Sequence, residues 1–148
     1  MIDIGERAPR LLIFVVLCLA FAAVPAGAAK RKMPDLAVTN AHATGLDLVH
    51  VQFLTENKGK KSAKESVTGV YLSSDAKKSD DDHRLGGRGI PKLRPGETST
   101  KSGGFAYPDS LEDGTYRVIV CADDKRDLKE KREANQCLTA PEPIPFGG

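Results

Sequence analysis

The feature that most constrains the fold is a series of short segments with the alternation of β-strands, separated by turn signals. Residues 48–55 are the clearest case, because Val49, Val51 and Phe53 fall on one face and polar residues on the other. The other expected strands are residues 36–38, 67–73, 85–90, 98–105 and 116–122, and a short one starting at Leu138. Without a convincing amphipathic helix, this spacing predicts an antiparallel β-sandwich.

The stretch LEDGTY, residues 111–116, is typical of a tyrosine corner. In that motif a tyrosine hydroxyl at the start of a strand bonds back to the backbone a few residues upstream. The alternative is an ordinary half-buried strand tyrosine. Either way, we expect Tyr116 to be structural.

The N-terminus has the pattern of a secretory signal peptide. Arg7 and Arg10 precede the apolar run 11–24, and Ala26-Gly27-Ala28 gives the small residues of a cleavage site. We expect residues 1–29 to form a signal helix that is removed after Ala28 or Ala29, although an uncleaved anchor is the alternative. The protein would then be secreted, or periplasmic in a bacterial cell envelope, and would touch the membrane only through the signal peptide before cleavage.

The cysteine count depends on this cleavage. Cys18 lies in the apolar run and would leave with it, so that Cys121 and Cys137 remain. In an oxidising compartment such a pair predicts a structural disulfide. The fifteen residues between the two cysteines form a loop whose closure stabilises the fold by ~3 kcal/mol in the chain-entropy model.

The strand pattern indicates how this disulfide lies. Tyr116, Val118 and Val120 share the face expected to point into the sandwich, and Cys121 falls on the other face. We therefore expect a link between neighbouring strands of one sheet rather than across the core.

Two other uses of the cysteines fit less well. Zinc needs about four ligands, usually in closely spaced pairs, and His42, His50 and His83 are far apart in sequence. A redox disulfide is usually C-x-x-C, which is absent.

The charged run between the cysteines has two interpretations. Near-neighbour pairs of opposite charge resemble a salt-bridged helix. The other interpretation is a hairpin with its turn at residues 123–126 and a strand through Leu128.

The acidic stretch SSDAKKSDDDH, residues 73–83, contains oxygen ligands of the kind that calcium prefers, in Asp75, Asp80 and Asp82. The glycine and glutamate spacing of an EF-hand is missing, so a solvated hairpin loop is the default and calcium a weak candidate. We expect no other metal and no cofactor.

Composition argues against several functions. The formal net charge is only +2 and tryptophan is absent, which gives no support for nucleic acid as a partner. No histidine has a visible nucleophile as its neighbour, and paired carboxylates occur in charged loops, so we expect no enzyme and assign no catalytic residue. The binding residues cannot be identified from these patterns.

Four successive stretches together resemble the CARDB family, the cell-adhesion-related domain found in bacteria: PDLAVTNAHA, VQFLTENKGKKSAKESVTGVYLSSD, DDDHRLGGRGIPKLRPGETST and GTYRVIVCADDKRDLKEKREANQC. The last is the most specific, because its Cys-Ala-Asp is followed by matching residues at Leu128, Glu130, Glu133, Asn135 and Cys137.

The resemblance implies an all-β fold, a seven-stranded antiparallel immunoglobulin-like β-sandwich, without catalytic residues. It favours the hairpin for the charged run, and a structural role for Tyr116, Leu128 and Asn135. The expected organisation is a signal peptide at 1–29, a basic linker at 30–33, the domain at 34–140 and a flexible proline-rich tail at 141–148.

The implied function is non-enzymatic binding of an unknown protein or cell-surface polymer at the cell envelope. Such domains often occur as modules of long surface proteins; a signal peptide with one domain weakens the expectation of an adhesin. One alternative is a periplasmic chaperone that uses an open sheet edge, against which the lysines of 58–64 argue. Another is an inhibitor of a secreted enzyme, acting through the glycine-rich segment 85–89.

Overall fold

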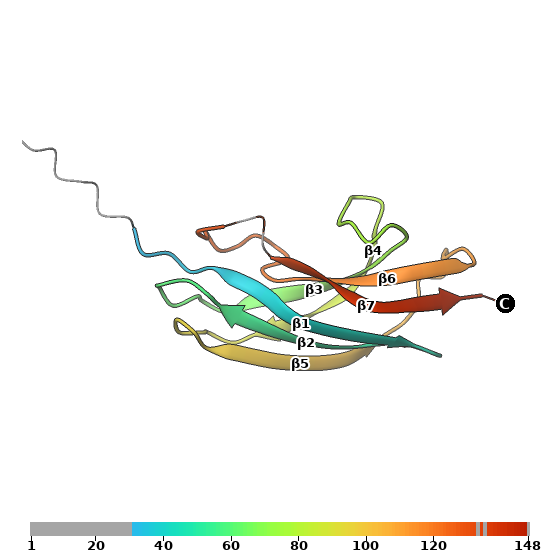
Figure 1. The fold of residues 1–148 in the computed structure, drawn as a ribbon, viewed down its shortest axis with the longest axis horizontal. Coiled ribbons are helices and arrows are strands. Elements are labelled where there is room, and N and C mark those ends of the chain that lie inside the picture. Colours follow the sequence, from blue (N-terminus) through green and yellow to red (C-terminus); the bar gives the residue numbers. More distant parts are fainter. Residues whose placement is uncertain (1–30, 133, 135, 148) are drawn as a thin grey trace, which may run out of the picture. The chain divides into compact units, whose positions relative to one another are not determined.

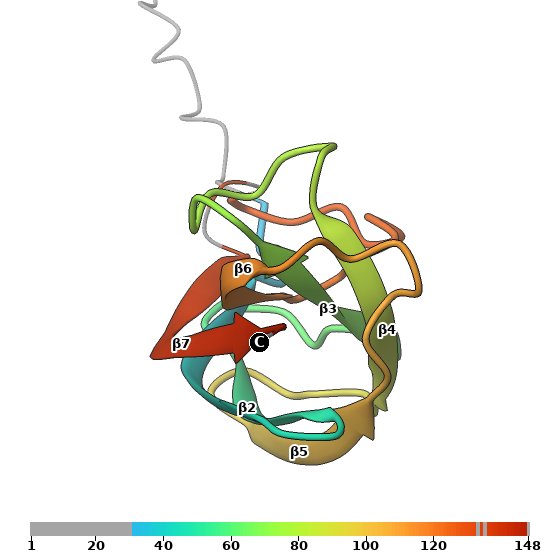
Figure 2. The same ribbon diagram turned by 90° about the vertical axis from the view of Figure 1, so that its right-hand side faces the viewer.

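The computed structural model describes residues 31–132, 134 and 136–147, and in these residues the chain forms two antiparallel sheets packed face to face (Figures 1 and 2). One sheet has the order β1-β2-β5, with β1 (Leu36–Gly45), β2 (Val49–Asn57) and β5 (Thr98–Phe105). The other has the order β4-β3-β6-β7, with β4 (His83–Ile90), β3 (Ser66–Ser73), β6 (Gly114–Cys121) and β7 (Cys137–Phe146). The predicted seven-stranded sandwich is confirmed.

The expected signal helix lies outside the described residues. Within the described part, no helix is long and apolar enough to cross a membrane.

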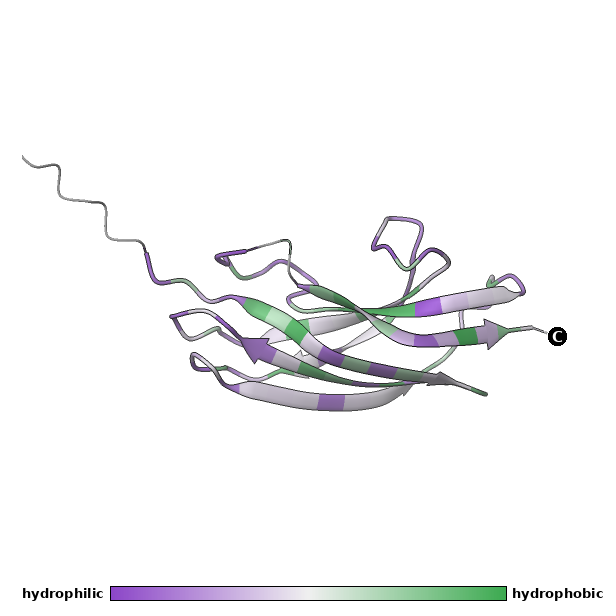
Figure 3. Cartoon of the chain, viewed as in Figure 1, coloured by the Kyte–Doolittle hydropathy of each residue, from purple (hydrophilic) through white to green (hydrophobic). Residues whose placement is uncertain are grey.

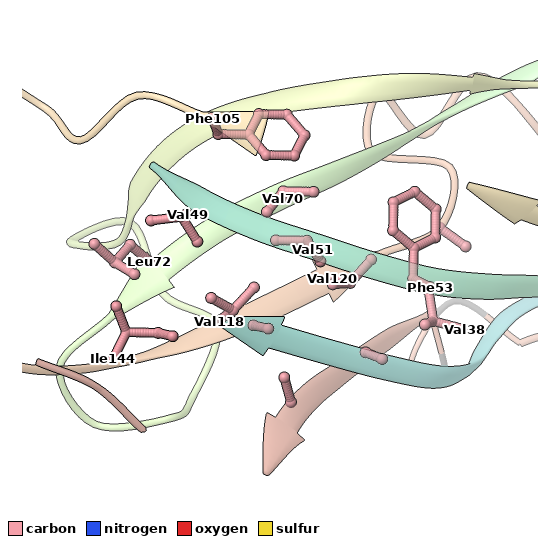
Figure 4. Packing of buried hydrophobic residues seen from close by; sticks show 14 of the residues in the cluster. Val38, Val49, Val51, Phe53, Val70, Leu72, Phe105, Val118, Val120 and Ile144 are labelled. Carbon is pink, nitrogen blue, oxygen red and sulfur yellow. The ribbon is translucent and has the colours of Figure 1, made fainter. Parts of the chain in front are cut away.

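The core lies between the sheets and follows the period of two. Val49, Val51 and Phe53 on β2 are buried, and Val118 and Val120 on β6 face them from the other sheet (Figure 4). Hydrophilic residues gather in the connections, while hydrophobic ones recur along the strands (Figure 3). The alternation predicted for 48–55 is therefore the one that builds the core.

Two polar contacts position the strands. The hydroxyls of Thr55 on β2 and Thr68 on β3, both fully buried, are 3.2 Å apart and join the two sheets. The Tyr116 hydroxyl donates to the carbonyl of Glu112 at 2.8 Å, which is the contact of a tyrosine corner.

The stretch expected to be a flexible tail is instead part of β7, so that prediction is wrong for residues 141–146. β7 pairs with β6 from Cys137 to Phe146, with a register shift between Arg117 and Ile119 of β6. Prolines 141, 143 and 145 are tolerated because β7 is an edge strand, where the missing N–H groups need no partner.

The sheet edges also differ from expectation. The lysines of 58–64 lie in the connection between β2 and β3, so they do not guard an edge. The glycine-rich segment 85–89 belongs to the edge strand β4 and is not an end loop. Its Arg88 donates to the carbonyl of Ser102 on β5 at 3.4 Å and lies over the Phe105 ring, bridging the open side of the sandwich.

Candidate binding surfaces

The disulfide joins two residues that stand directly opposite each other. Cys121, the last residue of β6, is paired in register with Cys137, the first residue of β7, and their sulfurs are 2.05 Å apart. Cys121 is buried but does not belong to the core cluster, which contains its neighbours Val120 and Ala122. The bond thus lies within one sheet, on its outer side.

The loop between the cysteines, residues 122–136, has a turn at its start but neither a helix nor a strand in its described residues. The expected strand through Leu128 is wrong, because buried Asp123 organises the chain differently. Asp123 takes a positive φ of 44°, and its carboxylate accepts the N–H groups of Asp127 at 3.1 Å and Leu128 at 2.9 Å. This carboxylate replaces the ladder bonds that a strand would have made.

The second half of this loop is attached to the start of the domain. Leu128 is half-buried and packs against the core. Buried Glu130 accepts the N–H of Leu36 at 3.1 Å, and the N–H of Lys131 donates to the carbonyl of Pro34 at 2.9 Å. Asn135 lies outside the described residues. The loop therefore fastens β1 to the β6–β7 hairpin.

Asp124 fastens the same loop to the outer face of β3 and β4. Its carboxylate accepts the hydroxyl of Tyr71 and pairs with the guanidinium of Arg84 at 2.8 Å. Burial, and then this hydrogen bond, raise the pKa of Tyr71 to about 12, while the same carboxylate raises the pKa of Arg84. The absence of a side chain at Gly69 provides the space for the Asp124 carboxylate, because a Cβ at this position would lie 2.4 Å from it.

The acidic loop keeps its carboxylates apart. Asp75 accepts the N–H of Lys77 at 2.9 Å, and this bond lowers the pKa of Asp75. Asp82 accepts the N–H of Ser79 at 2.7 Å, and Asp80 is exposed. Within the described ranges, no three His, Cys, Asp or Glu side chains are grouped so that they could hold a metal ion. Two of the three calcium candidates thus cap turns of the backbone.

The three-stranded sheet brings two of the distant histidines to one exposed face. His42 on β1 is paired with Gln52 on β2, and Thr44 with His50, so both rings project outward from adjacent rows. Small residues at 102–104 of β5 leave a shallow hollow of about 490 Å³ beside them. His42 also lies 2.9 Å from Glu142 of β7, and this hydrogen bond lowers the pKa of Glu142.

The residues that sequence reasoning missed are buried polar residues whose side chains hydrogen-bond to backbone groups of other segments. Asn57 is fully buried, accepts the N–H groups of Asp35 and Gly59, and donates to the carbonyls of Lys61 and Leu93. The pattern Asn-x-Gly at 57–59 is typical of a turn, and Cys-Ala-Asp at 121–123 matches the family pattern, but neither pattern shows that Asn57 and Asp123 bind backbone groups in this way. Nothing local could reveal which distant backbone groups these side chains satisfy.

Comparisons with known proteins agree with this architecture. The sequence model of the CARDB family matches residues 33–140. The CARDB domain of a Pyrococcus furiosus protein, crystallised in complex with di-metal ions, has a TM-score of 0.57 and 17% identity over 79% of this chain and 96% of that one. A Methanosarcina acetivorans domain, assigned to a cell surface protein, has a TM-score of 0.54 and 18% identity over 73% of this chain and 89% of that one.

At these identities the likeness shows the fold, and it confirms the immunoglobulin-like class. No curated protein matches the chain.

Proposed function

The chain belongs to the CARDB family, and from that premise we propose that it is an exported, non-enzymatic module that binds a protein or a surface polymer at the cell envelope. CARDB is a cell-surface-associated family, and one similar domain comes from a protein assigned to the cell surface. Export is supported by the signal-peptide pattern of residues 1–29. The disulfide between Cys121 and Cys137 also supports export, because disulfides persist in the oxidising environment outside the cytoplasm.

The observation that carries the binding role is the contrast between the two outer faces of the sandwich. The four-stranded sheet has its outer face covered by the chain's own loops: Thr139 of β7 donates to Ala76 of the acidic loop, and Asp124 holds Tyr71 and Arg84. The three-stranded sheet leaves His50, Gln52 and their neighbours exposed beside the hollow. A polar face of this kind, built on paired strands, offers directional hydrogen bonds to a ligand.

The test is retention of envelope material by the immobilised exported chain. The wild type and a control variant of exposed residues elsewhere, Ser110→Ala/Thr115→Ala, should retain one defined protein or polymer from the envelope extract of the host. The variant His50→Ala/Gln52→Ala should lose the component that is bound by the exposed face of the three-stranded sheet. The proposal fails if the wild type retains nothing above a blank resin, or if substrate screening detects turnover by the purified chain.

A further inference from the structure

The two ends of the sandwich carry opposite charge, although the whole chain is nearly neutral. One end, the basic end, consists of residues 31–35, 58–65, 91–97 and 122–136, which contain thirteen Lys or Arg and eight Asp or Glu, a net formal charge of +5. The opposite end, the acidic end, consists of residues 46–48, 74–82 and 106–113, with two Lys and eight Asp or Glu, a net formal charge of −6.

The four segments of the basic end are held together by their backbones (Figure 1). Lys58 donates its N–H to the carbonyl of Asp35 at 2.8 Å, and Ala63 and Leu93 form a β-bridge. The N–H of Lys131 donates to the carbonyl of Pro34 at 2.9 Å, so the loop between the cysteines, residues 122–136, belongs to the same end. The cations therefore share one surface rather than being spread over the molecule.

The basic end buries four of its seven described carboxylates and exposes its cations. Asp35, Asp123 and Glu130 are buried, and the Asp124 side chain is only 5% exposed because it is paired with Arg84 and Tyr71. All thirteen cations are exposed: Arg31, Lys32, Lys58, Lys60, Lys61, Lys64, Lys92, Arg94, Lys125, Arg126, Lys129, Lys131 and Arg132. The exposed carboxylates among the described residues of this end are Glu65, Glu97 and Asp127.

We propose that the basic end binds an anionic polymer of the cell envelope, one that bears phosphate or carboxylate groups along its chain. This inference rests on the proposed function, because it requires the exported protein to meet such polymers. Clustered Lys and Arg bind a polyanion mainly by releasing its condensed counterions, which needs no apolar contact.

The distribution of apolar side chains favours a polymer over a protein or a membrane. The large hydrophobic residues that the described chain exposes are Leu46 and Leu48, and both lie at the acidic end. A stable protein interface usually has an apolar centre, and an interfacial membrane contact usually inserts apolar side chains. Among the described residues, the basic end exposes many charged side chains but no large apolar side chain that could serve either kind of contact.

The test measures binding of the exported chain to inorganic polyphosphate and to alginate, a polyuronate, with neutral dextran as the control polymer. Both polyanions should bind, dextran should not, and affinity should fall by about tenfold or more on moving from low to physiological salt. Equal binding of dextran, or affinity that does not change with salt, would overturn the inference.

Two matched double variants locate the site. Lys60→Gln/Lys61→Gln at the basic end should weaken polyanion binding by about tenfold, because two contacts are lost. Lys77→Gln/Lys78→Gln removes the same charge at the acidic end and should leave binding within about twofold of wild type, since charges beyond a Debye length are screened. Equal losses in both variants would place the effect in net charge alone and contradict the proposal.

Two further outcomes would also refute the proposal that the basic end binds an anionic polymer. If the chain binds only phosphatidylglycerol vesicles, the partner of the basic end is a membrane. If the chain forms salt-sensitive oligomers in sedimentation and binds no polymer, the partner of the basic end is the acidic end of a second copy. If both polyanions fail to bind while the immobilised chain still retains an envelope component, this inference falls and the proposed function stands. Retention of nothing would count against the proposed function itself.

Discussion

Glu130 accepts a hydrogen bond from the backbone N–H of Leu36 at 3.1 Å, which joins the loop of the disulfide to the first residue of the first strand. Both residues are buried. The loop closed by Cys121 and Cys137 therefore holds β1 in place as well as linking β6 to β7. The charged run, whose sequence suggests either a salt-bridged helix or a hairpin, therefore holds the first strand against the β6–β7 pair.

Replacing Glu130 by alanine should lower the free energy of unfolding by about 2 kcal/mol, because a buried N–H loses its partner. Urea denaturation of the exported chain measures this. The matched control is Glu65→Ala, which removes an exposed carboxylate at the same end of the sandwich and should change stability by less than about 0.5 kcal/mol. Equal stability of the two variants would show that the contact between Glu130 and Leu36 contributes nothing to stability.

The tyrosine corner gives a second prediction. Tyr116→Phe removes only the hydroxyl that donates to Glu112 and should cost about 1 kcal/mol. Tyr107→Phe is the control, because half-buried Tyr107 stacks on Phe146 with ring centroids 4.8 Å apart and the substitution keeps that stack. The role assigned to Tyr116 is contradicted if its variant unfolds at the same denaturant concentration as the control.

Two glycines in neighbouring strands should respond differently to alanine. At Gly69 a Cβ would lie 2.4 Å from the Asp124 carboxylate, so Gly69→Ala should displace that side chain from Arg84 and cost about 1–3 kcal/mol. At Gly89 no atom lies within 4 Å of the added Cβ, and Gly89→Ala should be neutral or slightly stabilising. Thermal melts of both variants decide this, and a stable Gly69→Ala protein would be the contrary result.

The raised pKa of Tyr71 predicts a loss of stability at alkaline pH. A tyrosine whose pKa rises from 10.0 to about 12 on folding is favoured in its protonated form by the folded state. Its contribution is fully present below the unfolded pKa of about 10 and is lost as the pH rises towards 12. Unfolding free energies across this window should fall more steeply for wild type than for Tyr71→Phe, and parallel curves would refute the assignment.

The strands and their faces could be predicted because they depend on local alternation. The outward face of Cys121 follows from counting residues along β6, and the structure agrees. A short strand was expected to start at Leu138, but the continuation of β7 through residues 141–146 could not be predicted. Three prolines suit a strand only at a sheet edge, and the sequence does not show which strand lies there.

The long-range side-chain contacts and the separation of charge between the two ends could not be predicted for a different reason. Tyr71 and Asp124 are 53 residues apart, and no local signal pairs them. A formal net charge of +2 likewise conceals the segregation of charge, which depends on which connections meet at the same end of the sandwich. Properties that arise from long-range assembly need the fold before they can be read.

The most direct test of an exported, disulfide-closed binding module is intact mass spectrometry of the native protein from each cell fraction. The account predicts a chain beginning at Ala29 or Lys30 in the envelope or the medium, with a mass lower than that of the reduced form by two hydrogen atoms and a Cys121–Cys137 linked peptide after digestion. A full-length chain from Met1 in the cytoplasm, with free thiols at both positions, would contradict it.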